Sequence, residues 1–337
     1  MANLPLTLAL GHYDHTRDVT DGPVRVEGVD LRVLALPIEE IFYRFFFYRE
    51  WEISEISMGK YIGMRADGDH SVIAMPVYIS RMFRHSMFYV REGSAVKRPE
   101  DLKGKRIGIP EWGQTAGIYG RGYLTDYVGV PLKDMEWVQA GVNQPGRVEK
   151  IKLYLPDGVR YTAMPDRSLN ELLLAGELDC VMSARPPAGF GKGIARLMPE
   201  YQKLEEQYFR DTNIYPIMHS LCMQTKVLDA HPWVAMNLYK AFNEAKDRSV
   251  QRLSEVTASH APLAWVNEYT NSMRRIFGDD PYPYGIGKTA NGGSQGERMN
   301  YQTLDAFLKF GHDQGVCAKR LAPEELYPKS VMGQFKV

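Results

Sequence analysis

Short apolar runs alternate with amphipathic segments along the first part of the chain. Residues 6–10 and 31–36 are apolar runs of the length of a strand. Between residues 38 and 48 the apolar positions recur every three or four residues, which predicts a helix whose aromatic stripe packs in the core. Residues 51–56 alternate weakly between apolar and polar positions, and Ser57 after them is placed to cap a helix that extends to Met64.

The same alternation continues into the middle of the chain. Apolar or β-branched runs predict strands at residues 72–77, 106–110, 135–140 and 178–183, with helical patterns between or after them. Strands that alternate with helices favour a mostly parallel sheet. The fold class predicted by this pattern is therefore α/β.

Two extended segments, near His85 and near His219, enclose a self-contained α/β unit. We therefore expect two lobes joined by paired crossings. Residues 1–85 and 217–337 would form a discontinuous first lobe, and residues 86–216 the second. This architecture resembles the type II periplasmic-binding-protein-like fold, in which mixed sheets flanked by helices enclose a cleft between two lobes.

Helical patterns dominate the last third of the chain. They cover residues 233–249, 263–276 and 304–312. Residues 279–297 are rich in glycine and asparagine and predict one long loop, either a cover for the cleft or a plain connection.

Composition narrows the classes of ligand. The chain has 337 residues, of which 44% are apolar, enough to bury two moderate cores. Its 41 basic and 41 acidic side chains cancel, which argues against nucleic acid or an anionic membrane as a partner. An anionic ligand must therefore be held by a local cluster of cations.

The sequence favours a cytoplasmic location. Residues 6–10 form a first strand and not a signal peptide, because no basic segment precedes them. No window approaches the roughly 18 apolar residues that a membrane helix needs. The cysteines lie far apart without CxxC spacing, as is typical of buried thiols: Cys180, Cys222 and Cys317.

Candidate ligand residues gather just after predicted strands, where open α/β sheets bind their ligands. They are Asp14, Ser57, Arg81, His85, Trp112, Thr115, Arg147, Ser183 and Arg185, together with His219 on the second crossing. Helices that begin after Ser57 and near Thr115 would aim free backbone N–H groups into the cleft. With the arginines they would form a site for a small dianion.

Each of these residues also has a purely structural interpretation. Arg84 and Arg147 can lie on solvated faces or pair with acids. Trp112 either packs in the core or forms an aromatic wall for a planar ligand. His85 either takes part in function or is a hydrogen-bonded structural residue of the segment that crosses between the lobes. The sequence His-Tyr-Asp-His at residues 12–15 contains side chains that can bind a divalent metal, but their spacing matches no recognised zinc motif. A metal site is therefore one of the alternatives.

Long sequence blocks resemble the 4,5-dihydroxyphthalate decarboxylase family over nearly the whole chain. The blocks are GHYDHTR at residues 11–17, PIEEIF at 37–42, SEIS at 54–57, SRMFRHS at 80–86, PEWGQTA at 110–116, WVQAGVNQPGR at 137–147, MSARPP at 182–187 and HPWVAMN at 231–237. The resemblance implies loss of one carboxylate of 4,5-dihydroxyphthalate as CO2, giving protocatechuate in bacterial phthalate breakdown. No organic cofactor is required by such a reaction.

The implied reaction assigns a role to each kind of side chain. Arginines suit the second carboxylate, and the candidates are Arg81, Arg147 and Arg185. Asp14 or His219 suits the phenol para to the departing carboxylate. A histidine with a pKa near the usual value of about 6.5 can hold a proton at neutral pH, so His85 suits the protonation of the ring carbon. Ser57, Trp112, Thr115 and Ser183 complete the expected binding site.

Two other functions stay open at this stage. A solute-binding protein or sensor for a small aromatic carboxylate would have the same fold without catalysis. A decarboxylase of a related hydroxylated aromatic acid is the nearer alternative. In each case the expected ligand is a small aromatic acid. The sequence is also compatible with a homo-oligomer.

Overall fold

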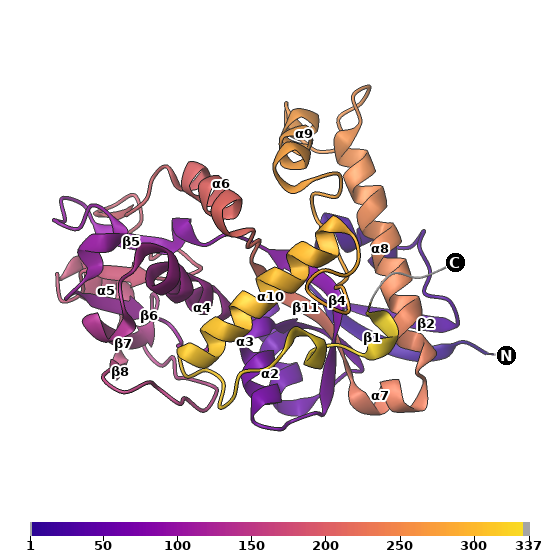
Figure 1. Cartoon of the computed structure of the whole chain (residues 1–337), viewed down its shortest axis with the longest axis horizontal. Coiled ribbons are helices and arrows are strands. Elements are labelled where there is room, and N and C mark those ends of the chain that lie inside the picture. Colours follow the sequence, from indigo (N-terminus) through magenta and orange to yellow (C-terminus); the bar gives the residue numbers. More distant parts are fainter. Residues whose placement is uncertain (1, 333–337) are drawn as a thin grey trace.

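The computed structural model describes residues 2–332 and shows two α/β lobes side by side (Figure 1). Lobe 1 is built on a five-stranded sheet with the order β2-β1-β3-β11-β4, and lobe 2 on a six-stranded sheet with the order β10-β5-β9-β6-β7-β8. The strands are β1 Leu4–Leu10, β2 Val29–Ala35, β3 Ile53–Ser57, β4 Val72–Arg81, β5 Phe88–Arg91, β6 Arg106–Ile109, β7 Glu136–Gly141, β8 Arg160–Ser168, β9 Cys180–Met182, β10 Ile194–Arg196 and β11 Ile217–Gln224.

Helices flank both sheets. The α-helices are α1 Arg17–Thr20, α2 Ile38–Tyr48, α3 Met58–Ala66, α4 Thr115–Gly122, α5 Leu169–Leu174, α6 Tyr201–Thr212, α7 Thr225–Ala230, α8 Trp233–Ser254, α9 Val266–Phe277 and α10 Gln295–Asp313. Short helical turns used below are η1 Asp14–Thr16, η2 His85–Met87 and η4 Tyr123–Val128, the last of which is π-helical. No helix in residues 2–332 is both long and apolar enough to cross a bilayer.

The chain passes between the two sheets after β4 and again before β11. Strand β11 runs antiparallel to both β3 and β4, and its register sets His219 opposite Ser57 and Ser80. The start of β11 therefore lies at the edge of the sheet where β3 and β4 end. The exact lobe boundaries expected from the sequence stay a prediction.

The predicted elements differ from the structure mainly where polar residues form structure. Helix α2 has the predicted bounds, but β8 and β10 were not predicted. Helix α10 begins at Gln295, so the predicted loop is shorter than expected at its C-terminal end. The reason is a capping box, in which the Ser294 side chain accepts from the backbone of Glu297 and the Glu297 carboxylate accepts from the backbone of Ser294.

The largest apolar core extends through both lobes, and a smaller separate cluster lies in lobe 2. A single buried cluster includes Leu8 and Ile53 of lobe 1 together with Phe88 and Ile107 of lobe 2. Helix α10 crosses from lobe 1 to α4 in lobe 2 (Figure 1), where Phe307 stacks on a tyrosine of α4. The lobes are thus joined by packing as well as by the two chain crossings.

The cysteines behave as the sequence predicts. Cys180, Cys222 and Cys317 are buried free thiols. Burial raises the pKa of each thiol, to about 12 for Cys317 and further for the other two, so each stays protonated and unreactive at neutral pH.

Candidate functional site

A cavity of about 380 Å³ lies between the lobes. Its walls come from the ends of strands in both sheets, from α2 and from the first turns of α3 and α4. The lining residues are Tyr13, Ile38, Glu39, Phe42, Ser57, Lys60, Ser80, Met82, Arg84, Pro110, Glu111, Gln114, Thr115, Ala116, Val142, Arg147, Lys150, Ser183, Ala184, Arg185, Met218 and His219. This is the position at which open α/β sheets bind ligands.

One wall of the cavity is a cluster of cations around a buried carboxylate. Glu111 is 1% exposed, and its side chain forms ion pairs with Arg147 at 2.6 Å, Lys150 at 3.1 Å and Lys60 at 3.5 Å. Three positive charges therefore face one negative charge. The excess of cations suits an anionic ligand better than a neutral one.

Burial and charge act on this cluster in opposite directions. Burial alone would raise the pKa of Glu111, but Lys60, Arg147 and Lys150 hold it below its ordinary value. Glu111 is therefore ionised at neutral pH. Burial lowers the pKa of Lys60, Glu111 opposes that shift, and the nearby Lys150 and Arg147 add to it.

A carboxylate–histidine pair lies at another part of the wall, where only the histidine lines the cavity. Glu55 is fully buried, and its Oε1 lies 2.6 Å from His219 Nδ1. The Tyr13 hydroxyl donates to the same oxygen at 2.6 Å, and the Gly11 amide donates to Oε2 at 3.2 Å. Burial and the neighbouring Glu55 raise the pKa of Tyr13 far above its ordinary value, so its hydroxyl stays a donor.

His219 is oriented by this pair. Its ring meets Phe42 edge to face at 4.9 Å, and no described residue hydrogen bonds its Nε2. The hydrogen bond from Nδ1–H to Glu55 places the proton of the neutral ring on Nδ1. Nε2 is then a free acceptor on a residue that lines the cavity.

The two helix starts predicted from the sequence meet in the cavity wall. The hydroxyls of Ser57 and Thr115 lie 2.9 Å apart, and Thr115 Oγ1 accepts from the Gly59 amide at 2.8 Å. Ser57 and Gln114 take the N-cap positions of α3 and α4, although neither side chain caps its helix. The first turns of these helices therefore contact each other across the lobes.

Two further arginines reach the cavity. Arg84 forms no ion pair with any described residue, and its Nε lies 3.2 Å from Met218 Sδ. Burial lowers the pKa of Arg84 to about 10, against the opposing charge of Glu205, so its guanidinium keeps its charge at neutral pH. Arg185 is exposed at the mouth, where it pairs with Glu39 of α2 across the two lobes at 2.6 Å.

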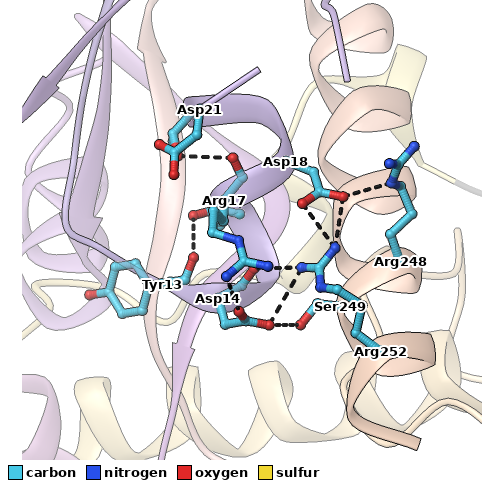
Figure 2. Close-up of polar contacts among 10 residues, drawn as sticks. Tyr13, Asp14, Arg17, Asp18, Asp21, Arg248, Ser249 and Arg252 are labelled. Carbon is cyan, nitrogen blue, oxygen red and sulfur yellow. Dashed lines mark hydrogen bonds and ion pairs between the residues drawn. The ribbon is translucent and has the colours of Figure 1, made fainter. Parts of the chain in front are cut away.

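The structure corrects the predicted placement of Asp14. Tyr13 and Asp14 are consecutive but point in opposite directions (Figure 2), and only Tyr13 lines the cavity. Asp14 accepts from the Ser249 hydroxyl of α8 and lies 3.5 Å from Arg252. Its carboxylate is engaged on the far side of η1, so it is not available to a ligand in the cavity.

Arg81 and Trp112 are also misplaced by the sequence prediction. Arg81 is 7% exposed and donates to the carbonyls of Tyr215 and Pro283 and to the amide oxygen of Asn300. Trp112 is fully buried, and its indole donates to the Gln314 carbonyl at 2.8 Å. Both side chains are structural because the residues after α9 and α10 cover them.

His85 lies outside the cavity as well. It is 4% exposed, and its ring packs between Tyr123 and Tyr208 at 4.3 and 5.2 Å. Neither ring nitrogen has a hydrogen-bond partner in the described chain, and Nδ1 is 3.6 Å from Glu205. His85 is not among the residues that line the cavity, so the structure does not support it as a proton donor to a ligand there.

The metal-compatible stretch near the N-terminus has other partners. His15 is half-buried, with Nδ1 2.7 Å from the Tyr284 hydroxyl and Nε2 3.0 Å from the Ile79 carbonyl. Burial lowers the pKa of His15 to about 4. Residues 2–332 contain no group of three or more His, Cys, Asp or Glu side chains placed to hold a metal ion.

Comparison with curated proteins gives one relative that matches over its full length. The chain is 36% identical to a 4,5-dihydroxyphthalate decarboxylase of Comamonas testosteroni in an alignment of 341 positions that covers all of both chains. The chain belongs to the 4,5-dihydroxyphthalate decarboxylase family. A second family member, from Pseudomonas putida, is 39% identical over 194 residues, or 57% of this chain and 75% of the relative.

No protein-family model matches the chain. Solved structures confirm the fold expected for this family member. A periplasmic aliphatic sulphonate binding protein of Escherichia coli aligns with a TM-score of 0.53 at 11% identity, covering 98% of this chain and 99% of the other. A putative periplasmic sulfonate-binding protein of Methylobacillus flagellatus aligns with a TM-score of 0.51 at 13% identity, covering 98% and 93%. These likenesses show the periplasmic-binding-protein fold alone.

Several predicted residues of this family member do reach the cavity. They are Ser57, Thr115, Arg147, Ser183, Arg185 and His219. Sequence reasoning missed Tyr13, Glu55, Lys60, Glu111 and Lys150. Lys60 and Glu111 had a usable signal, because each lies within four residues of a predicted strand end. Glu55 had none, because a lone acid inside an apolar strand does not reveal its partner.

Proposed function

We propose that this aromatic acid decarboxylase converts 4,5-dihydroxyphthalate to protocatechuate and CO2 in the cavity between its lobes. The observation that carries the proposal is the excess of cations around Glu111 in the same cavity as the Glu55–His219 pair. A decarboxylase for a hydroxylated diacid needs cations to bind the carboxylates and a base to accept the phenol proton. Membership of the family supports the class of reaction.

The cationic wall suits the two carboxylates of the substrate. Lys60, Arg147 and Lys150 carry two more positive charges than Glu111 neutralises. Arg84 adds a charge that no described carboxylate neutralises through an ion pair. Opposite charges attract more strongly in such a partly buried site than in water, so a dianion is favoured over a neutral aromatic compound.

His219 suits the removal of the phenol proton. Its free Nε2 accepts the proton from the hydroxyl para to the departing carboxylate, and Glu55 stabilises the imidazolium that forms. Tyr13 and the Gly11 amide hold the Glu55 carboxylate in place. The oxygen lone pair then pushes electron density into the ring.

The ring carbon that bears the carboxylate next accepts a proton, and the intermediate loses CO2. Breaking the carbon–carboxylate bond returns its electron pair to the ring and restores aromaticity. The phenolate then regains its proton from His219. The reaction consumes one proton from solvent overall, and no redox partner is needed for this balance.

The test is direct assay of the purified protein. We expect 4,5-dihydroxyphthalate to disappear as protocatechuate and CO2 form, measured by chromatography and gas release. His219→Gln is expected to lower kcat at least about 100-fold, because a general base contributes about 100- to 10,000-fold. His312→Gln is the matched control, since His312 is exposed on α10.

Three outcomes would contradict the proposal. Binding of the diacid without turnover by the wild-type protein would favour a solute-binding protein or sensor. Faster turnover of another acid in a panel of hydroxylated aromatic acids would assign a different substrate. Wild-type activity in the His219 variant would remove His219 from the mechanism.

The cytoplasmic location and the homo-oligomer also stay predictions. The three buried free thiols support a reducing compartment. Cell fractionation and light scattering would test the two predictions separately.

A further inference from the structure

The proposed reaction needs an acid that protonates the ring carbon, and His85, the acid expected from the sequence, does not line the cavity. This carbon bears the departing carboxylate, so the acid must lie beside the carboxylate site. His219 is assigned to the phenol, which lies para to this carbon on the opposite side of the ring. The acid therefore belongs to the cationic wall around Glu111.

Most groups of that wall are unsuited to the role. Glu111 is kept ionised by three cations and has no proton to give. The Arg147 guanidinium is too weak an acid, because its ordinary pKa is above about 12. The hydroxyls of Ser57 and Thr115 hydrogen bond each other. The lysines Lys60 and Lys150 remain.

The two lysines differ in burial and in contacts. Lys150 is more exposed, at 27% of its side chain, and it donates to Glu111 Oε1 at 3.1 Å. Lys60 is 11% exposed and lies 3.5 Å from the other oxygen of Glu111. Lys60 also lies on the first turn of α3, beside the contact between the two helix starts.

From this geometry we propose that Lys60 is the catalytic acid that protonates the ring carbon. The inference rests on the proposed function. Glu111 holds the ammonium group in the wall, and the low exposure of Lys60 keeps water from competing for the transferred proton. The same burial lowers the pKa of Lys60, which makes its ammonium a better acid than that of an exposed lysine.

The step balances without a further reactant. An N–H bond of Lys60 breaks and its electron pair stays on Nζ. A C–H bond forms from a π pair of the ring, which the phenolate oxygen has enriched. Loss of CO2 returns the pair of the broken C–C bond to the ring. Lys60 then takes a new proton from water after the product leaves.

The variant Lys60→Arg separates acidity from charge. Arginine keeps the positive charge for binding but gives up its proton far less readily. We expect kcat to fall at least about 100-fold while KM and the Kd of phthalate, as a non-reacting probe, change less than about threefold. Lys203→Arg is the matched control, because Lys203 is exposed on α6 and does not line the cavity, and it is expected to keep kcat within about threefold of wild type.

A pH profile distinguishes acid catalysis from a structural role. Wild-type kcat should fall at high pH as Lys60 loses its proton, at a pH below the ordinary lysine pKa of about 10.4. The groups that face Lys60 are Glu111, Arg147 and Lys150, so the profile is also recorded for Lys150→Arg. The fall of kcat at high pH should be retained in Lys150→Arg. It should be absent from the residual activity of Lys60→Arg.

Failure of this inference is distinct from failure of the proposed function. If the wild-type protein converts the diacid and Lys60→Arg keeps kcat, Lys60 is not the acid. A rise in KM with unchanged kcat would make it a binding residue only. If Lys60→Arg is unstable in thermal melts, Lys60→Gln with retained phthalate binding repeats the test. If the wild-type protein itself is inactive, the proposed function fails.

Discussion

Glu55 lies at the centre of the site although it does not line the cavity. It is fully buried and receives hydrogen bonds from Tyr13 and Gly11, and its contact with His219 links it to the reacting groups. A carboxylate so enclosed is costly to bury unless its partners are well placed. We therefore regard Glu55 as a positioning residue that acts through His219.

Glu55→Gln tests this role at the residue scale. The amide cannot stabilise an imidazolium as a carboxylate does, so we expect kcat to fall by about 10- to 100-fold, less than for His219→Gln. Phthalate binding, measured by calorimetry, should be unchanged. Glu52→Gln is the control, because Glu52 accepts from the Thr7 amide and does not line the cavity. Equal activity of wild type and Glu55→Gln would contradict the positioning role.

The sequence predicts where a residue lies along an edge of a sheet better than where its side chain points. Tyr13 and Asp14 follow the same strand, yet only Tyr13 faces the cavity. Arg81 and Arg84 belong to one block, and the residues after α9 cover Arg81 alone. The deciding contacts come from residues about 200 positions later in the chain, which local patterns do not encode.

At the scale of elements, the segment that carries Tyr13 is fixed by α8. Asp18 of α1 is 5% exposed and accepts from Arg248 at 2.6 Å and from Arg252 at 2.8 and 2.9 Å (Figure 2). Asp14 adds its contacts with Ser249 and Arg252. This network joins the turn after β1 to a helix of the last third of the chain.

Asp18→Asn is expected to weaken this connection in a pH-dependent way. Burial alone would raise the pKa of Asp18, but Arg252 and Arg248 hold it below its ordinary value. Such a group stabilises the fold above its unfolded pKa of about 3.9, and the effect is lost as pH falls through the lower folded value. We expect a loss of about 1–3 kcal/mol in the free energy of unfolding at pH 7, measured by urea denaturation.

The difference between wild type and variant should shrink toward zero below about pH 4. Asp21→Asn, in the exposed turn after α1, serves as the control. Its free energy of unfolding should stay within about 0.5 kcal/mol of wild type at pH 7 and below pH 4. A constant difference at all pH values would show that the loss comes from packing and not from charge.

Elements with strong apolar periodicity were predictable, and polar ones were not. The aromatic stripe of α2 gives both ends of that helix, although Phe42 lines the cavity as well as packing against the core. Strand β8 is mostly exposed and contains charged residues, so it forms because it can pair with β7. Context of this kind overrides local preference.

At the scale of the whole molecule, the cavity depends on how closely the lobes approach. The first turns of α3 and α4 touch at Gly59, where a Cβ atom would lie 2.4 Å from the Gly113 carbonyl oxygen. No ordinary Cβ contact is that short. Glycine at this position therefore allows the two halves of the site to come together.

Gly59→Ala is expected to separate the lobes slightly. Alanine favours a helix by about 0.5–1 kcal/mol over glycine, but the clash with a backbone oxygen outweighs this gain. We expect a lower melting temperature and a fall of 10- to 100-fold in kcat/KM, since about 1 Å of misplacement can cost that much. Gly63→Ala on the same helix is the control, with its nearest contact at 3.3 Å. Unchanged activity of Gly59→Ala would show that close approach at this point is not required.

Helix α10 also determines when the lobes can be fastened during synthesis. Phe307 stacks on Tyr119 of lobe 2, Asn300 accepts from Arg81 of lobe 1, and Gln314 accepts from Arg121 of α4. All three follow both sheets in the chain, so the ribosome produces every strand of the two sheets before the helix that joins them. Until then the aromatic face of α4 has no partner on that side. A chain that folds during synthesis therefore forms its sheets before α10 can clamp them, and the apolar surface of α4 is then open to chaperones.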